Sequence, residues 1–141
     1  VRFINNIDLA LLEIDPPYPL KVIPLADSDK VKLGDEIFSI GNSFLLNNTV
    51  SGGKVIGLGS HHSRSNPEKI TDLIQTTVTL YAGDSGGPLF DRHGHLVGLM
   101  TAKEKSSDRS SFAIPSNKIA EHLFDYIDKK SKIQHHGPQN P

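Results

Sequence analysis

Short apolar stretches rich in valine, isoleucine and threonine recur along most of this chain, and glycine, proline or runs of polar residues end each of them. Such stretches favour β-strands, because β-branched side chains fit the pleated, half-buried surface of a sheet. The pattern predicts strands over residues 8–14, 36–40, 49–58, 73–80, 88–90, 95–101 and 112–114. The first of these is an almost unbroken apolar run, which is typical of a buried strand. Many short strands in one chain indicate an all-β barrel or sandwich.

Glycines add detail to two of these regions. Gly94 can take the positive φ that a bulged hairpin between residues 88–90 and 95–101 needs. Gly52 and Gly53 interrupt the stretch 49–58 and predict a bulge or the close approach of another backbone.

A single helix is expected near the C-terminus. Its apolar residues fall on one face at helical spacing. They are Ile119, Ala120, Leu123, Phe124 and Ile127. Ser116, which follows Pro115, is suited to cap the N-terminus of this helix. The pattern stops after Lys129, and we expect residues 131–141 to form a disordered tail.

The composition excludes several functional classes. The net charge of −1 argues against a general nucleic-acid or membrane-surface binder. No apolar run approaches the roughly 20 residues that a bilayer span requires. Because cysteine is absent, disulfides, thiolate catalysis and cysteine-ligated zinc are excluded. The histidine pairs 61–62, 93/95 and 135–136 lack a nearby third ligand, so we expect surface histidines and neither a metal nor another cofactor.

The string Gly83-Asp84-Ser85-Gly86-Gly87-Pro88 carries the clearest chemical signal. A serine hydroxyl is a weak nucleophile that needs a nearby base and N–H donors aimed at the oxyanion that forms on attack. Glycines beside the serine let the backbone turn such donors inward without a side chain in the way. The string therefore indicates a nucleophilic serine, whereas its shorter core, G-x-S-x-G, also fits an ordinary glycine-rich turn.

The same letters match the nucleophile elbow of α/β-hydrolases. That elbow leads directly into a helix. Here Gly87 and Pro88 follow the serine, a strand–turn–strand pattern comes next, and strands do not alternate with helices along the chain. These features disfavour an α/β-hydrolase.

GDSGGP resembles the active-site motif of trypsin-like serine proteases, and its flanks are similar to the HtrA/Deg branch of that family. Further matching pieces occur in the family's order between roughly Ile7 and Ile119. They are Asp8-Leu-Ala-Leu-Leu, Pro24-Leu-Ala-Asp-Ser-Asp, Val31-Lys-Leu-Gly-Asp, Ile40-Gly-Asn, Thr49-Val-Ser-Gly-Gly-Lys-Val, Ile74-Gln-Thr and Phe112-Ala-Ile-Pro-Ser-Asn-Lys. The resemblance implies the C-terminal six-stranded β-barrel of a chymotrypsin-like double-barrel fold, with part of the first barrel and a C-terminal helix.

The resemblance also divides the chain. Residues 1–40 would be a remnant of the N-terminal barrel and the crossover between barrels. Residues 41–130 would be the protease barrel with its terminal helix, and residues 131–141 the tail.

Carried over position by position, the resemblance implies Ser85 as the nucleophile and Asp8 as the acid that orients the catalytic histidine. The N–H groups of Gly83 and Ser85 would form the oxyanion hole. Thr101 would support Asp8 and begin the strand that pairs with substrate. The wall of the specificity pocket would come from Leu80, Tyr81, Ala82, Thr101, Ala102, Lys103, Phe112 and Ala113. Asp84 would pair with a cation or cap a turn.

The catalytic histidine of this family precedes the aspartate, yet only seven residues precede Asp8 and none is histidine. We expect a fragment that begins after the histidine and is nearly inert alone, since losing a triad member removes several orders of magnitude of rate. Loss of the base in a lineage that kept the scaffold, and replacement by another histidine, are the alternatives. The replacement candidates are His61, His62, His93, His95, His122, His135 and His136. His93 and His95 are expected at a hairpin tip directed away from Ser85.

The resemblance further implies an HtrA/Deg-like serine endopeptidase of protein quality control, acting on unfolded or extended polypeptides outside the cytoplasm. A homotrimer is one assembly that it allows for the full-length protein. Thr79 stands where trypsins carry the aspartate that binds arginine or lysine, so small or medium aliphatic P1 residues are favoured, and Lys103 could alter this preference. The alternative function is a pseudoprotease or a peptide-binding half-barrel.

Overall fold

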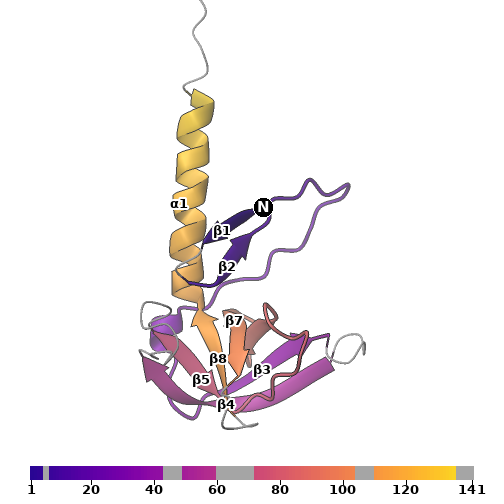
Figure 1. Ribbon diagram of the computed structural model, residues 1–141, viewed down its shortest axis with the longest axis vertical. Helices are drawn as coiled ribbons and strands as arrows, with labels where there is room; N and C mark the ends of the chain where they lie inside the picture. The colour runs from indigo at the N-terminus through magenta and orange to yellow at the C-terminus, as the bar shows by residue number, and fades with distance from the viewer. Residues whose placement is uncertain (5–6, 43–48, 60–71, 104–109, 136–141) are drawn as a thin grey trace, which may run out of the picture.

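The computed structural model describes residues 1–4, 7–42, 49–59, 72–103 and 110–135. A closed barrel of six antiparallel strands forms its base, and one helix stands on the barrel (Figure 1). The strands are β3 (Glu36–Gly41), β4 (Thr49–Gly59), β5 (Leu73–Thr76), β6 (Pro88–Asp91), β7 (Leu96–Lys103) and β8 (Ser111–Pro115). They follow the order β3–β4–β5–β8–β7–β6, and β6 closes the barrel by pairing with β3. The predicted all-β fold with a six-stranded barrel and a C-terminal helix is confirmed.

Aliphatic side chains fill the barrel, because successive residues of a strand point to opposite faces. In β4, for example, Val55 is 1% exposed whereas the adjacent Ile56 is 46% exposed. The main core cluster consists of Ile37, Val55, Ile74, Val78, Leu80, Leu89, Val97, Met100 and Ala113. A smaller cluster of Leu73, Phe112 and Ile114 packs against Ile119 of the helix. The base of the helix therefore covers part of the barrel.

Two strands differ in detail from the prediction. β5 ends at Thr76 rather than continuing to residue 80, because the residues that follow bond outside the regular ladder. Gly53 provides the predicted close approach, since a Cβ there would lie 2.7 Å from the backbone nitrogen of Val78. The register shift in β4 falls later, between Val55 and Gly57.

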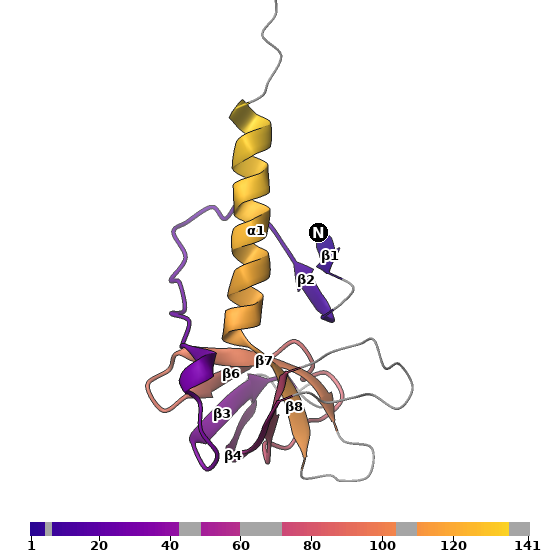
Figure 2. The same cartoon turned by 90° about the vertical axis from the view of Figure 1, so that its left-hand side faces the viewer.

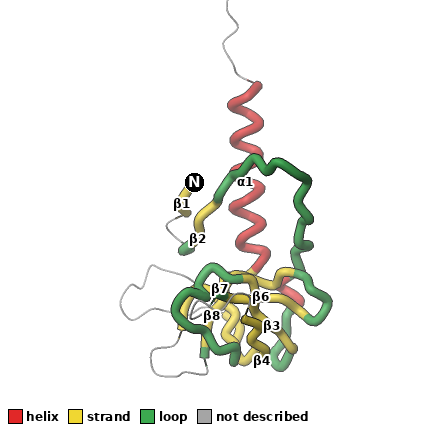
Figure 3. The backbone as a smooth tube through the Cα atoms, turned by 90° about the vertical axis from the view of Figure 1, so that its right-hand side faces the viewer, coloured by secondary structure: helices red, strands yellow, loops and turns green. Residues whose placement is uncertain are grey.

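The residues before β3 lie outside the barrel. β1 (Arg2–Ile4) and β2 (Leu9–Leu11) form a two-stranded ribbon, and an extended segment leads from it to the 3-10 turn η1 (Ser28–Lys30). The ribbon and this segment appear on either side of the helix in Figures 2 and 3, whereas Figure 1 shows both of them to the right of it. The buried strand predicted over residues 8–14 was wrong, because Leu12 and Ile14 are 64% and 66% exposed in the described chain. The predicted boundary between residues 40 and 41 falls inside β3, which belongs to the barrel.

Side chains at the surface join both the ribbon and the segment just after it to the helix α1 (Ser116–His135). Glu13 accepts hydrogen bonds from the Lys130 ammonium and from the Tyr126 hydroxyl, the latter at 3.1 Å. These bonds lower the pKa of the Glu13 carboxyl, and its bond raises the pKa of Lys130. The Arg2 guanidinium lies 5.7 Å from the centre of the Tyr126 ring. Exposed contacts of this kind are individually weak.

The start of α1 is capped by η1. The Asn117 N–H donates to Ser28 Oγ at 3.1 Å, and the Ser28 N–H donates to Asn117 Oδ1 at 3.3 Å. Ser116, the predicted cap, instead donates its hydroxyl to the Ala26 carbonyl at 2.7 Å, so that prediction was wrong.

The far end of α1 also differs from the prediction. The helix runs to His135 instead of ending at Lys129, so residues 131–135 are helical, and residues 136–141 of the predicted tail lie outside the described residues. Phe124 and Ile127, on its predicted apolar face, are exposed. Within the described chain, no helix is both long and apolar enough to cross a membrane.

Candidate active site

Ser85 lies on an exposed turn between β5 and β6. On either side of it, Gly83 and Gly86 have φ values of 102° and 85°, a conformation that residues with a side chain rarely adopt. The Gly87 N–H closes the turn by donating to the Asp84 carbonyl at 2.9 Å. The glycines therefore allow the chain to fold tightly around a serine that solvent can reach.

Asp84 is buried within this turn and caps it. Capping a turn was one of the two roles expected for it, and pairing with a cation was the other. Its Oδ2 accepts the Tyr81 N–H at 2.9 Å, and its own N–H donates to the Tyr81 carbonyl at 3.1 Å. Its Oδ1 has no partner among the described residues. A Cβ on Gly41, at the end of β3, would come within 2.2 Å of that oxygen, so only glycine fits there.

Replacing Asp84 by asparagine is expected to change the free energy of unfolding by less than about 1 kcal/mol, because asparagine can still accept the Tyr81 N–H. Replacing it by alanine leaves that N–H unsatisfied and a cavity in place of the side chain, and should cost about 2–3 kcal/mol. Urea unfolding followed by circular dichroism measures both. Equal losses in the two variants would mean that Oδ1 has a donor outside the described residues.

Strands β3 and β7 fix the turn from two sides. The Gly86 N–H donates to the Met100 carbonyl at 2.7 Å, and the Met100 N–H donates to the Gly87 carbonyl at 2.9 Å. Ser39 of β3 donates its hydroxyl to the Pro88 carbonyl at 2.8 Å, where β6 begins. The turn is thus attached to the barrel both just before β6 and at the first residue of β6.

Two N–H groups of the turn are unused within the described chain. Asp84, Gly86 and Gly87 all donate to backbone carbonyls, but Gly83 and Ser85 have no acceptor among the described residues. A hydroxyl accompanied by two unused N–H donors has the components needed to attack a carbonyl carbon and to bind the oxyanion that results.

Asp8 reaches the same side of the barrel from the ribbon. It lies in the turn between β1 and β2 with a φ of 55°, which is uncommon for a residue with a side chain. Thr101 of β7 donates its hydroxyl to Asp8 Oδ2 at 2.6 Å. Thr101 directly follows Met100, so consecutive residues of β7 contact Asp8 and the serine turn. The contact between Thr101 and Asp8 that the resemblance implied is present.

Comparison with known proteins decides the family. Residues 1–99, which include both Asp8 and Ser85, match the model of the trypsin-like peptidase domain. The chain is 40% identical over 129 residues to the periplasmic pH-dependent serine endoprotease DegQ of Escherichia coli. This chain belongs to the HtrA/Deg family of trypsin-like peptidases. Another member, the serine protease HTR4 of Rattus norvegicus, is 34% identical over 137 residues.

Solved HtrA-type structures agree with this assignment. The HtrA-type protease AlgW, solved with a tripeptide, has a TM-score of 0.79 and 35% identity, and the match covers 89% of this chain and 42% of AlgW. The matches cover 87% and 91% of this chain but only 28% of DegQ and 26% of HTR4. This HtrA-type chain therefore spans about a quarter of the curated relatives that it matches.

Two histidines of this HtrA-type chain lie away from Ser85. His93 and His95 flank Gly94, whose φ of 79° makes the predicted hairpin tip between β6 and β7. The hairpin tip and the serine turn adjoin opposite ends of β6. The carboxylate beside His95 is that of Asp91, whose Oδ2 lies 3.4 Å from His95 Nδ1.

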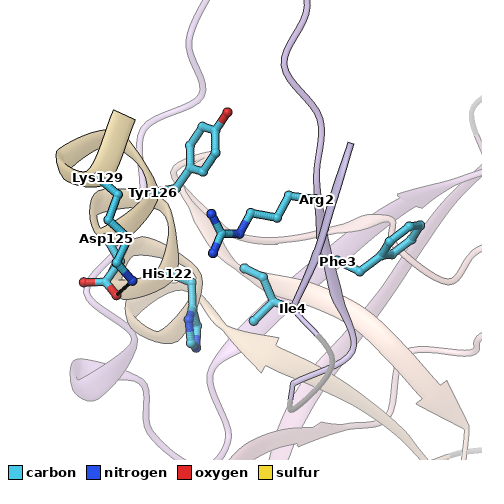
Figure 4. A pocket seen from close by; sticks show the side chains of 7 residues that line it. All are labelled: Arg2, Phe3, Ile4, His122, Asp125, Tyr126 and Lys129. Atoms are coloured by element: carbon cyan, nitrogen blue, oxygen red, sulfur yellow. Dashed lines mark hydrogen bonds and ion pairs between the residues drawn. The ribbon is translucent and has the colours of Figure 1, made fainter. Parts of the chain in front are cut away.

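His122, on α1, faces a cavity of about 150 Å³ between the helix and β1 (Figure 4). The cavity is lined by Arg2, Phe3, Ile4, His122, Asp125, Tyr126 and Lys129. Thr101 is the sole hydrogen-bond partner of Asp8 among the described residues, so His122 does not bond to it. The other candidates, His61, His62, His136 and the side chain of His135, lie outside the described part of the chain. No cluster of three or more potential metal ligands occurs in the described part.

The residues implied for the specificity pocket differ in burial. Leu80, Phe112 and Ala113 are buried. Tyr81 and Ala82, next to the serine turn, are exposed. Whether these five side chains contact a substrate stays a prediction.

The end of β7 offers an unpaired edge. Ala102 and Lys103 pair with β8 on one side. On the other side, pairing with β6 ends at Leu99 and the serine turn bonds to Met100. In the described chain, residues 101–103 therefore keep one edge without a neighbouring strand.

Sequence reasoning missed two residues that shape the turn. Gly41 leaves space for Asp84, and the match of Ile40-Gly-Asn to the family was a signal for it. Ser39 bonds to Pro88 across 49 positions, and no local pattern marks such a contact.

Proposed function

We propose that the protein carrying this chain is a serine endopeptidase that hydrolyses peptide bonds through an acyl-enzyme on Ser85. The observation that carries this proposal is the pair of contacts made by adjacent residues of β7. Met100 bonds to the serine turn and Thr101 bonds to Asp8, so a single strand sets the nucleophile and the acid relative to each other.

The proposed chemistry follows from these groups. The Ser85 oxygen attacks the peptide carbonyl carbon while its proton passes to a histidine outside the described residues. Asp8 orients that histidine and stabilises its positive charge. The N–H groups of Gly83 and Ser85 bind the oxyanion. The protonated histidine then gives its proton to the leaving amine, the C–N bond breaks, and water hydrolyses the acyl-enzyme.

The proposed substrates are unfolded or extended polypeptides, which add a strand to the free edge of residues 101–103. AlgW has been solved with a tripeptide and with a decapeptide, which supports a peptide as the ligand. Because relatives are named periplasmic endoproteases, the proposed location is outside the cytoplasm. A role in protein quality control, which the family resemblance implies, belongs to the same proposal. Small or medium aliphatic P1 residues and a homotrimer of the full-length protein belong to the same proposal.

A pseudoprotease that binds peptides without cleaving them is the second candidate. It is favoured by the absence of a described histidine bonded to Asp8. The presence of the GDSGGP motif argues against a pseudoprotease, because peptide binding does not require a nucleophilic serine.

Labelling with an organofluorophosphonate distinguishes the candidates. The complete protein should be labelled at Ser85 and the Ser85→Ala variant should not. If the base lies outside the 141-residue chain, that chain alone should react at least about 1,000-fold more slowly. An unlabelled complete protein would favour the pseudoprotease. Rapid labelling of the chain alone would place the base among its own histidines.

A further inference from the structure

Two hydroxyl groups meet inside the barrel, away from solvent. Thr76, the last residue of β5, is 0% exposed, and Ser111, the first residue of β8, is 1% exposed. Their oxygens lie 2.9 Å apart. Both also contact the backbone of Val78: the Val78 N–H donates to Thr76 Oγ1 at 3.1 Å, and Ser111 Oγ donates to the Val78 carbonyl at 2.7 Å.

These contacts fix the direction of every proton. The Val78 carbonyl can only accept, so the single proton of Ser111 goes to it. Ser111 must therefore accept in its contact with Thr76, and the Thr76 proton points to Ser111. The three bonds form a closed ring in which each donor and each hydroxyl proton is used once. Hydrogen bonds in such a ring strengthen one another in a low-dielectric interior.

The ring lies where the chain leaves the barrel wall. Val78 follows the end of β5, and side-chain hydroxyls satisfy both of its backbone polar groups in place of a neighbouring strand. The adjacent Thr77 still bonds to β4 just before this point. Its N–H donates to the Lys54 carbonyl at 2.9 Å, and its hydroxyl accepts the Lys54 N–H at 2.9 Å. From this point the chain runs through residues 79–82 to the serine turn.

We propose that the Thr76–Ser111 pair is a positioning element for Ser85: it directs the chain out of the sheet at Val78 and so sets the N–H groups and hydroxyl of the turn. This inference rests on the proposed function. Between Val78 and Tyr81, which Asp84 caps, Leu80 is the one side chain that belongs to the main core cluster among the described residues. A change in direction at Val78 is therefore transmitted to the turn.

The test compares Thr76→Val, Ser111→Ala and Thr76→Ser with the control Ser116→Ala. Thr76→Val keeps the side-chain shape and removes the hydroxyl, whereas Thr76→Ser keeps the hydroxyl. Ser116 is equally buried and its hydroxyl also donates to a carbonyl at 2.7 Å, but it follows the opposite end of β8 from Ser111, at the base of the helix. The control thus loses a comparable bond that does not touch residues 76–85.

Two measurements are made under conditions in which every variant is folded. The first is amide hydrogen exchange at Asp84 and Gly86, whose N–H groups bond within and beside the turn. The second is the rate at which an organofluorophosphonate acylates Ser85 in the complete protein. We expect Thr76→Val and Ser111→Ala to exchange faster at these amides and to be acylated about 10- to 100-fold more slowly, since small misplacements of reacting groups have effects of this size.

Thr76→Ser should restore the acylation rate, and Ser116→Ala should lower only the urea midpoint. If Thr76→Val does not fold, Ser111→Ala, which removes a single oxygen, provides the same test. Unchanged exchange and acylation in folded Ser111→Ala would overturn the positioning role. A wild-type complete protein that is not acylated at all would refute the proposed function instead, while the exchange measurement would still decide the role of the pair.

Discussion

Replacing Asp8 by asparagine is expected to lower kcat of the complete protein by about 10⁴-fold, the loss typical of a serine triad whose acid loses its charge. The amide would accept the Thr101 hydroxyl as the carboxylate does, but it would present an N–H₂ group or a neutral oxygen to the histidine. The histidine side chain would then be held in the wrong tautomer, and its positive charge would not be stabilised. Steady-state cleavage of an unfolded protein substrate measures kcat and KM.

The stability of the Asp8→Asn variant should stay close to that of the wild type, because Asp8 is exposed. Asp15→Asn is the matched control: it removes an equally exposed carboxylate a few residues further along the chain and should leave kcat unchanged. Thr101→Val, which removes the donor to Asp8, should lower kcat by a smaller factor. A kcat above one tenth of the wild-type value in Asp8→Asn would rule out Asp8 as the acid.

The strands of the barrel could be predicted from sequence because their signals are local. Alternating burial in β4 and the buried Ile74 and Thr76 of β5 reflect which side chains fill the interior. The turn glycines were also recognisable from sequence. Gly94 has the positive φ that its position suggested, and Gly83 and Gly86, two of the glycines expected to shape the serine turn, have a positive φ as well. The resemblance to a known family supplied what these signals lack, namely the number of strands and the closure of the barrel.

The elements that were predicted incorrectly depend on contacts between distant residues. Ser116 looks like a helix cap in sequence, but Ser28 takes that role across 89 positions. The apolar run from Asp8 onward resembles a buried strand, yet its burial would need a covering layer that the described chain does not provide. Periodicity in a single sequence reports on the side chain and its neighbours, and not on which distant element will pack against it.

The candidate site likewise combines features that local sequence signals reveal with features that depend on contacts between distant residues. Ser85 and its glycines are recognisable as a string, whereas the contacts that place them come from four strands, β3, β5, β7 and β8. Ser39 holds the end of the turn, Met100 holds its middle, and the Thr76–Ser111 pair directs its beginning. The string specifies which groups are present, and the closed barrel specifies where they lie.

Because the site depends on barrel closure, Gly98→Ala should be the most damaging single-methyl change in β7. A Cβ at Gly98 would lie 2.5 Å from the Ile114 carbonyl oxygen and 3.4 Å from the Ala113 Cβ. The nearest atom belongs to the backbone of β8, so no side-chain rotation relieves the contact. We expect the free energy of unfolding to fall by about 3 kcal/mol, the upper end for overpacking. That loss is a large fraction of the roughly 5–15 kcal/mol that stabilises a typical domain.

Gly52→Ala provides the control, since it adds the same methyl group to a strand of the same barrel. No atom lies within 4 Å of a Cβ at Gly52, and its φ is ordinary for a residue with a side chain. Alanine should stabilise that position by roughly 0.5 kcal/mol, because glycine loses more backbone entropy on folding. Urea unfolding is followed by circular dichroism, as the chain has no tryptophan. Equal stabilities for the two variants would show that β7 and β8 do not pack as closely as the contacts at Gly98 indicate. The placement of Met100 and Thr101, which belong to the same strand as Gly98, would then lose its basis.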